Sequence, residues 1–129
     1  MILVDTHILL FLGLTPERLS AKAKDTIEHA APGELLISSV SAWEIAMLVS
    51  KKRIQLPLPP REWFGKVIKE YGIQDIVLDT ASAARAMELP PIHNDPCDRW
   101  ILATAMTFGL PLITADAMFA KYGVVPIIW

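Results

Sequence analysis

The sequence predicts an α/β fold in which a mainly parallel sheet, roughly five-stranded, is covered by helices on both faces. Short apolar runs alternate along the chain with longer segments of helical periodicity. The runs are apolar throughout rather than alternating with polar residues, which is typical of parallel strands buried on both faces. With 129 residues, we expect a single domain over residues 1–129 that is long enough to bury a core.

The first half of the chain is predicted to alternate between strands and helices. Ile2–Asp5 and Leu35–Ser38 are short apolar runs, which indicates buried strands. Between them, a short helix over His7–Leu12 is expected to stop at Gly13. Ser20 then caps a helix that runs to about Ala31, where Pro32 and Gly33 end it. After the second strand, Ser41 opens a helix to about Lys51, whose apolar positions recur at helical spacing.

The second half continues the alternation after a stiff, proline-rich connector over Leu56–Pro60. An apolar stripe predicts an amphipathic helix from Arg61 to Tyr71, which Gly72 ends. The remaining elements are expected, in order, to be a strand at Ile76–Leu78, a helix at Thr80–Glu88, a loop at Leu89–Asn94, a helix from Asp95-Pro96 to Phe108-Gly109, a strand at Leu112–Thr114, a helical turn near Met118 and a strand at Val124–Ile128.

Composition narrows the class of protein. Hydrophobic residues make up 53% of the chain and charged residues 20%, which excludes a disordered chain, and part of the apolar excess suits a subunit interface. The net charge of −2 gives no overall basic field for nucleic acid. The single cysteine, Cys97, suits a reducing compartment. The longest apolar run, Ile8–Leu14, is too short to span a bilayer, and the N-terminal segment does not resemble a secretory signal, so we expect a cytoplasmic protein.

Four acidic residues lie where an apolar run ends or a helix begins: Asp5, Glu44, Asp98 and Asp116. Asp5 follows the first apolar run, and Asp116 follows the run that ends at Thr114. If these runs are neighbouring parallel strands, both carboxylates lie at the same edge of the sheet, where open α/β folds place their sites. Crowded carboxylates repel one another unless a cation neutralises them. The pattern therefore predicts a divalent metal site, and its oxygen ligands favour Mg²⁺ or Mn²⁺ over zinc.

Two of the acidic segments also have a purely structural interpretation. Ser41 and Glu44 have the spacing of a capping box, in which the glutamate bonds to the backbone of the cap residue. Asp95 is a natural helix cap before Pro96, and Asp98 in the first turn would complement the helix dipole. Since one acceptor already caps that helix, Asp98 is the better metal candidate of the two. Capping and metal binding can coexist at Glu44.

Other polar residues have weaker signals. Thr114 is expected to bond a carboxylate or a metal-bound water, or else to fill a strand end. His7 and His93 lack zinc-ligand spacing and a nucleophile partner, so we expect structural hydrogen-bonding roles for them. The basic cluster Lys51-Lys52-Arg53 suits either a solvated helix end or a contact with nucleic acid.

Taken together, the motifs resemble those of PIN-domain ribonucleases and, more narrowly, of the VapC toxins of bacterial type II toxin–antitoxin modules. The resemblance covers essentially the whole chain and rests on Asp5-Thr6-His7, Ser41-Ala-Trp-Glu44-Ile45, the Leu89–His93 loop, Asp95-Pro-Cys-Asp98-Arg99 and Thr114-Ala-Asp116. Cys97 departs from the family, which often has an aromatic residue there. That difference should alter local packing rather than chemistry, because neighbouring acids do not favour a thiolate.

The resemblance implies a PIN-like three-layer α/β/α sandwich and a Mg²⁺- or Mn²⁺-dependent endoribonuclease with one or two ions per site. Asp5, Glu44, Asp98 and Asp116 would be the catalytic and metal-binding residues, with Thr6 and Thr114 supporting them. Attack by a metal-activated water would leave a 5′-phosphate and a 3′-hydroxyl. Lys51, Lys52, Arg53 and Arg99 would contact RNA phosphates, although Arg99 could equally pair with a neighbouring acid. The expected partners are a VapB-like antitoxin, an RNA substrate (tRNA, rRNA or mRNA) and a second copy of the chain.

Two other classes of protein are alternatives. A PIN fold without catalytic activity would act as an interaction module, although the complete set of acids argues against it. Phosphoryl-accepting α/β domains also place an aspartate after their first strand. However, haloacid dehalogenases need a second aspartate where this chain has His7, and receiver domains need a lysine after the last strand, where Val124–Trp129 has none.

Overall fold

A five-stranded parallel sheet forms the centre of the computed structural model, which describes residues 1–129. The strands follow the order β3-β2-β1-β4-β5, so the first strand lies in the middle and the chain adds strands on both sides of it. Their bounds are Ile2–Val4 for β1, Leu35–Ser38 for β2, Gln74–Ile76 for β3, Leu112–Ile113 for β4 and Ile127–Ile128 for β5. The predicted α/β fold with a parallel sheet is confirmed.

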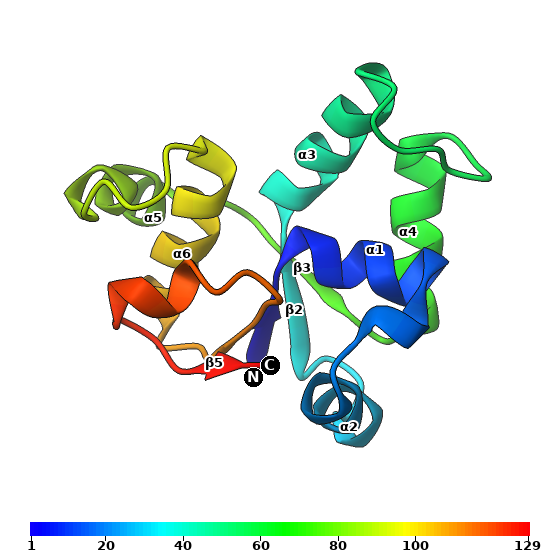
Figure 1. The fold of residues 1–129 in the computed structure, drawn as a ribbon, viewed down its shortest axis with the longest axis horizontal. Helices are drawn as coiled ribbons and strands as arrows, with labels where there is room; N and C mark the ends of the chain where they lie inside the picture. The colour runs from blue at the N-terminus through cyan, green and yellow to red at the C-terminus, as the bar shows by residue number, and fades with distance from the viewer.

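Helices cover both faces of the sheet and make it the middle of three layers. In Figure 1, α1, α2 and α4 lie on one side of the strands and α5 and α6 on the other, while α3 rises from the end of β2. The helices are α1 (Thr6–Leu14), α2 (Ala21–His29), α3 (Ser39–Ser50), α4 (Pro60–Glu70), α5 (Thr80–Arg85) and α6 (Pro96–Phe108), with short 3-10 turns η1 (Pro16–Arg18), η2 (Ala86–Glu88) and η3 (Phe119–Tyr122). No helix has the length and apolar character needed to traverse a membrane.

The core has two halves because adjacent residues of each strand point to opposite faces. In β1, Val4 joins the cluster formed with α1 to α4, whereas Leu3 joins the cluster formed with α6 and η3. Ile113 and Leu112 divide between the same two clusters in β4. Since both faces are covered, all residues of β2 and β4 and the residues Leu3 and Val4 of β1 are buried, which explains why these runs are mainly apolar.

Several predicted boundaries were wrong, each for an identifiable reason. Helix α3 begins at Ser39, because Ser38 rather than Ser41 caps it with its hydroxyl. Strand β3 covers Gln74–Ile76 rather than Ile76–Leu78; it is an edge strand with exposed polar residues, so no apolar run marks it. The predicted Thr80–Glu88 helix divides into α5 and η2, and the last strand is shorter than expected.

Gly13 was expected to stop the first helix, but α1 continues through it to Leu14. The reason for a glycine here is close packing against α4. A Cβ atom at position 13 would clash with Cζ2 of Trp63, a residue that is itself buried. The glycine therefore allows α1 and the Trp63 indole to approach each other.

We expect Gly13→Ala to destabilise the protein by about 1–3 kcal/mol, because the added methyl group must displace the packed indole. Gly65→Ala is the matched control, since a Cβ atom there meets nothing within 4 Å. In an exposed helix interior that control should stabilise the protein by about 0.5–1 kcal/mol. Urea denaturation of both variants measures the difference, and equal effects would show that α1 does not pack on Trp63 as described.

Candidate active site

The four acidic residues singled out in the sequence meet in one pocket at the carboxyl end of the sheet. Strands β1 and β4 are parallel neighbours, and the Asp5 amide donates to the Ile113 carbonyl at 3.0 Å. The predicted convergence of Asp5 and Asp116 at one edge is thus confirmed. The pocket has a volume of about 270 Å³ and is lined by Asp5, His7, Phe11, Glu44, Asp95, Asp98, Ala115 and Asp116.

Asp5 is the most rigidly held of these acids. Its side chain is only 3% exposed, and Oδ1 caps α1 by accepting the Thr6 amide at 2.7 Å. Oδ2 accepts a hydrogen bond from the Thr114 hydroxyl at 2.8 Å, which confirms that Thr114 bonds a carboxylate. Burial raises the pKa of Asp5, although these hydrogen bonds oppose the shift. A nearby cation would therefore stabilise its ionised form.

Glu44 points into the pocket from the second turn of α3 and is 4% exposed. The predicted capping box is wrong, because Ser41 lies inside the helix and its hydroxyl pairs with the Thr6 hydroxyl at 2.8 Å. Thr6 also donates to Oε2 of Glu44 at 3.4 Å, so this threonine ties α1 to the carboxylate of α3. Burial, together with the charges of Asp5 and Asp95, raises the pKa of Glu44 to about 7.

The start of α6 brings two further carboxylates to the pocket. Asp95 caps the helix as predicted, since its Oδ1 accepts the Cys97 amide at 2.9 Å. Its carboxylate nevertheless lies in the same cluster as those of Glu44 and Asp98. Burial raises the pKa of Asp98 to about 8, and the surrounding carboxylates add to the shift. The helix cap and the acidic cluster thus share Asp95.

Cys97 is not suited to act as a nucleophile. Burial and the neighbouring acids raise the pKa of its thiol to about 12, so it stays protonated at neutral pH. This agrees with the expectation that its departure from the family pattern does not change the chemistry.

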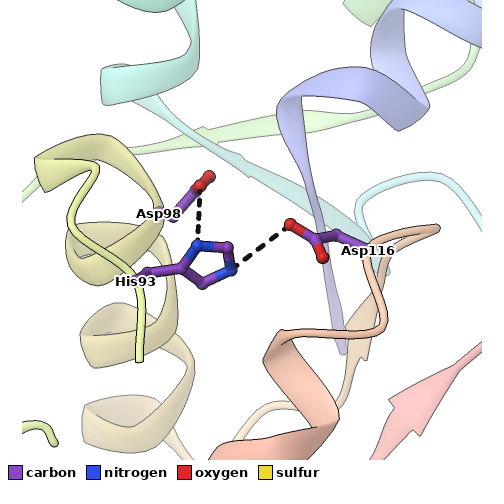
Figure 2. Close-up of side chains that lie close together, drawn as sticks. All are labelled: His93, Asp98 and Asp116. Atoms are coloured by element: carbon purple, nitrogen blue, oxygen red, sulfur yellow. Dashed lines mark ion pairs between the residues drawn. The ribbon is translucent and has the colours of Figure 1, made fainter. Parts of the chain in front are cut away.

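His93 belongs to the site, although its sequence context predicted only a structural role. Figure 2 shows its imidazole between two of the carboxylates, with Nδ1 3.5 Å from Oδ2 of Asp98 and Nε2 3.3 Å from Oδ2 of Asp116. The ring packs against Phe119 and stacks nearly parallel to Tyr122, whose hydroxyl accepts the His93 amide. His7, by contrast, is exposed at the rim of the pocket and makes no hydrogen bond, so its expected structural role is wrong.

Arg99 holds the loop that carries His93. Its guanidinium donates to the carbonyl groups of Ala86, Leu89, Pro90 and His93 at 2.7–3.2 Å. The guanidinium is therefore occupied, and neither expected role, a phosphate contact or an ion pair with an acid, describes it. Sequence could not reveal this role because the acceptors are backbone atoms.

Replacing Arg99 with alanine should destabilise the protein by roughly 2–4 kcal/mol, because several carbonyl groups lose a charged donor at once. Arg99→Lys should recover little of the loss, since a single ammonium cannot reach the same set of acceptors. Thermal denaturation measures both. A lysine variant as stable as the parent would contradict the proposed anchoring of the loop.

The basic cluster lies away from the pocket. Lys51 follows α3 at its C-terminal end, whereas Glu44 lies in the N-terminal half of the same helix. All three side chains of Lys51, Lys52 and Arg53 are exposed and form no ion pair. Their positive charges interact favourably with the negative end of the α3 dipole, and their side chains are free to contact a phosphate backbone.

The residues of the pocket fit a divalent cation. Two groups of residues each have potential ligand atoms that lie within 4.8 Å of one another; one group is Glu44, Asp95 and Asp98, and the other is His93, Asp98 and Asp116. Burial and the neighbouring carboxylates raise the pKa values of Asp5, Glu44 and Asp98, so their ionised forms would be favoured by a nearby cation. In addition, Nε2 of His93 is buried without a hydrogen-bond partner. A donor set dominated by carboxylate oxygens suits Mg²⁺ or Mn²⁺.

Comparisons with known proteins agree with this architecture. The PIN-domain family model matches residues 2–125. The chain is 35% identical over 116 residues to ribonuclease VapC22 of Mycobacterium tuberculosis, covering 89% of this chain and 86% of the relative. Among solved structures, the fold is similar to VapC20 of M. tuberculosis, a toxin that cleaves the sarcin–ricin loop (TM-score 0.73, 16% identity, 100% of both chains). It is also similar to VapBC2 of Rickettsia felis bound to promoter DNA (TM-score 0.70, 18% identity, 98% and 97% of the chains). The chain belongs to the PIN-domain family and, within it, to the VapC ribonucleases.

Proposed function

We propose that this chain is the toxin of a VapBC-type toxin–antitoxin module, acting in the cytoplasm as a Mg²⁺- or Mn²⁺-dependent endoribonuclease, with residues 1–129 as its single catalytic domain. The observation that carries the proposal is the pocket at the sheet edge, where Asp5, Glu44, Asp98 and Asp116 lie together. The 35% sequence identity with ribonuclease VapC22 supports RNA as the substrate.

A bound divalent ion would supply a water of lowered pKa and would polarise the scissile phosphate. The chain's own residues then have distinct tasks. Asp5 keeps one orientation, because Thr6 and Thr114 hold its two oxygens. Asp98 and Asp116 complete the ligand set from α6 and from the segment after β4.

Glu44 is placed to accept a proton from the attacking water. Its carboxylate is buried and lines the same pocket as the proposed metal ligands, which is the position that a general base for a metal-bound water requires. Thr6 donates to Oε2 and so helps to fix the orientation of the carboxylate. Attack of the water on phosphorus, with cleavage of the P–O3′ bond, gives a 5′-phosphate and a 3′-hydroxyl.

A VapB-like antitoxin and a second copy of the chain are the proposed protein partners. The chain has an exposed apolar groove of about 400 Å³ lined by Trp43, Met47, Asp95, Pro96, Cys97 and Trp100, and the Trp43 side chain is 61% exposed. A large exposed ring in an apolar groove is typical of a protein contact. We assign this groove to the homodimer interface. Sedimentation of the Trp43→Lys variant and the parent protein tests the assignment, and we expect the variant to lose the dimer.

Cleavage of a pool of tRNA, rRNA and mRNA tests the proposed function. Purified protein should cut RNA with Mg²⁺ or Mn²⁺, leave 5′-phosphate ends and lose activity in EDTA. Asp5→Asn should remove cleavage while the fold, followed by circular dichroism, is retained. Cleavage that persists in EDTA and in Asp5→Asn would overturn the proposal. A folded protein that binds the metal but cuts no RNA would indicate a catalytically silent interaction module.

The exposed cluster Lys51, Lys52 and Arg53 should contribute to RNA affinity through phosphate contacts. Replacing all of them with alanine should weaken RNA binding and reduce the slope of log Kd against log salt by about 0.7 for each lost phosphate contact. Lys22→Ala, an exposed cation on α2, is the control and should leave the slope unchanged. Binding is measured with the inactive Asp5→Asn protein. An unaltered slope would show that the cluster does not contact RNA phosphates.

A further inference from the structure

One nitrogen atom beside the pocket has no role in the proposed cleavage reaction. Nε2 of His93 is buried, lies 3.3 Å from Oδ2 of Asp116 and has no hydrogen-bond partner of acceptable geometry. A buried polar atom without a partner is unfavourable, so native proteins seldom keep one unless something else occupies the position. The ring cannot swing away to water, since Phe119 and Tyr122 pack against it and its amide is bound to the Tyr122 hydroxyl.

The acidic residues form two groups rather than one. Glu44 and Asp95 form the inner group with Asp98, whereas His93 and Asp116 form the outer group with the same Asp98. The outer group is more accessible, as the Asp116 side chain is 39% exposed, and it is the one that contains a nitrogen (Figure 2). Asp98 belongs to both groups, but in the outer group its Oδ2 faces Nδ1 of His93, whereas Asp116 faces Nε2.

We propose that His93 Nε2 and Asp116 bind a cation at an outer position beside the pocket, and that Asp98, which faces the Nδ1 side of the ring, orients the imidazole without being a ligand of that outer ion. This rests on the proposed metal-dependent function and deepens it. The orientation of the ring supports the assignment. Nδ1 faces Oδ2 of Asp98 at 3.5 Å, and metal-binding histidines generally direct their second nitrogen to a carboxylate, which fixes the ring and its tautomer.

A nitrogen ligand changes which metal the outer position prefers. Mg²⁺ demands oxygen ligands and retains its waters, whereas transition metals accept imidazole more readily. The outer position should therefore take Mn²⁺ in preference to Mg²⁺, while the inner position, with only carboxylates, discriminates less between them.

Pulsed EPR of the protein loaded with Mn²⁺ tests the proposal without any assay of RNA cleavage. Imidazole coordination gives the electron spin echo a modulation from directly bound ¹⁴N, which carboxylate and water ligands do not give. The chain has three histidines, so single replacements assign the signal completely. The variants are His93→Gln, with His93→Asn as a second choice if the first is unstable, His7→Gln as the control at the pocket rim and His29→Gln as the remote control.

We expect the ¹⁴N modulation in the parent, His7→Gln and His29→Gln proteins and its loss in His93→Gln. Mn²⁺ titration should show two ions per chain in the parent, with the weaker affinity reduced about 10-fold or more in His93→Gln. Mn²⁺ bound without any ¹⁴N signal, or a signal lost only in His7→Gln, would overturn the assignment of His93 and leave the proposed function intact. Failure of the parent to bind Mn²⁺ at all would overturn both.

Discussion

Asp98→Asn is expected to reduce RNA cleavage by roughly 10³-fold or more, since it removes a charged carboxylate that belongs to both clusters of potential ligands. The isosteric amide keeps the shape of the side chain, so the loss would reflect charge rather than packing. Cleavage rates with saturating Mn²⁺ measure the effect. Asp75→Asn is the matched control because Asp75 is an exposed aspartate of β3 outside the pocket, and its activity should equal that of the parent.

The same substitution should stabilise the metal-free protein. The folded state raises the pKa of Asp98 to about 8, which means that the ionised carboxylate is unfavourable in the fold at neutral pH. A neutral amide removes that penalty, and we expect a gain on the order of 1–2 kcal/mol at pH 8 in EDTA. A variant that loses both activity and stability in the absence of metal would contradict the view that charge repulsion, relieved by a cation, dominates the pocket.

Stability of the metal-free protein should fall as the pH rises from about 4 to about 8. Asp98 and Glu44 have folded-state pKa values of about 8 and about 7, above the ordinary values of 3.8 and 4.5, and the pKa of Asp5 is raised as well. Within this window the folded state binds more protons than the unfolded state, so each increase in pH favours unfolding. We expect a loss on the order of a few kcal/mol, measured by urea denaturation in EDTA.

Divalent metal should reverse this trend. Since the ligands must be deprotonated to bind a cation, Mg²⁺ or Mn²⁺ should stabilise the protein strongly at pH 8 and weakly at pH 5. Asp98→Asn serves as the control and should show a flatter pH profile and a smaller stabilisation by metal. Equal stabilisation by metal at both pH values would indicate ions bound elsewhere than the carboxylates of the pocket.

Much of the fold could be predicted because strands that are buried on both faces appear in the sequence as continuous apolar runs. The apolar runs at Ile2–Val4 and Leu35–Ser38 form central strands, where every side chain except that of Ile2 is buried. Strand β3 has no such apolar run, because it lies at the sheet edge with Gln74 and Asp75 exposed. Gly13 was misinterpreted for a related reason. A glycine is needed at this position because the indole of Trp63, which is distant in sequence, packs closely against it. Rules for helix ends consider only neighbouring residues and do not describe such a contact.

The site could be predicted where the topology of the sheet determines it. Residues that follow adjacent parallel strands must meet at one edge, so Asp5 and Asp116 could be placed together from sequence order alone. His93 could not be placed in this way, because its contact with Asp116 depends on how a loop folds over the end of the sheet. That loop is fixed by bonds from Arg99 to backbone carbonyls, for which the sequence carries no signal beyond the arginine itself.

The anomalous difference map of a crystal soaked in Mn²⁺ tests the central claim most directly, since it locates the ion without reference to any assay. We predict peaks inside the pocket bounded by Asp5, Glu44, Asp98 and Asp116, and their loss in a crystal of Asp98→Asn. A pocket that stays empty at saturating Mn²⁺, or peaks found only on the outer surface of the protein, would contradict the assignment of this sheet edge as a metal-dependent active site.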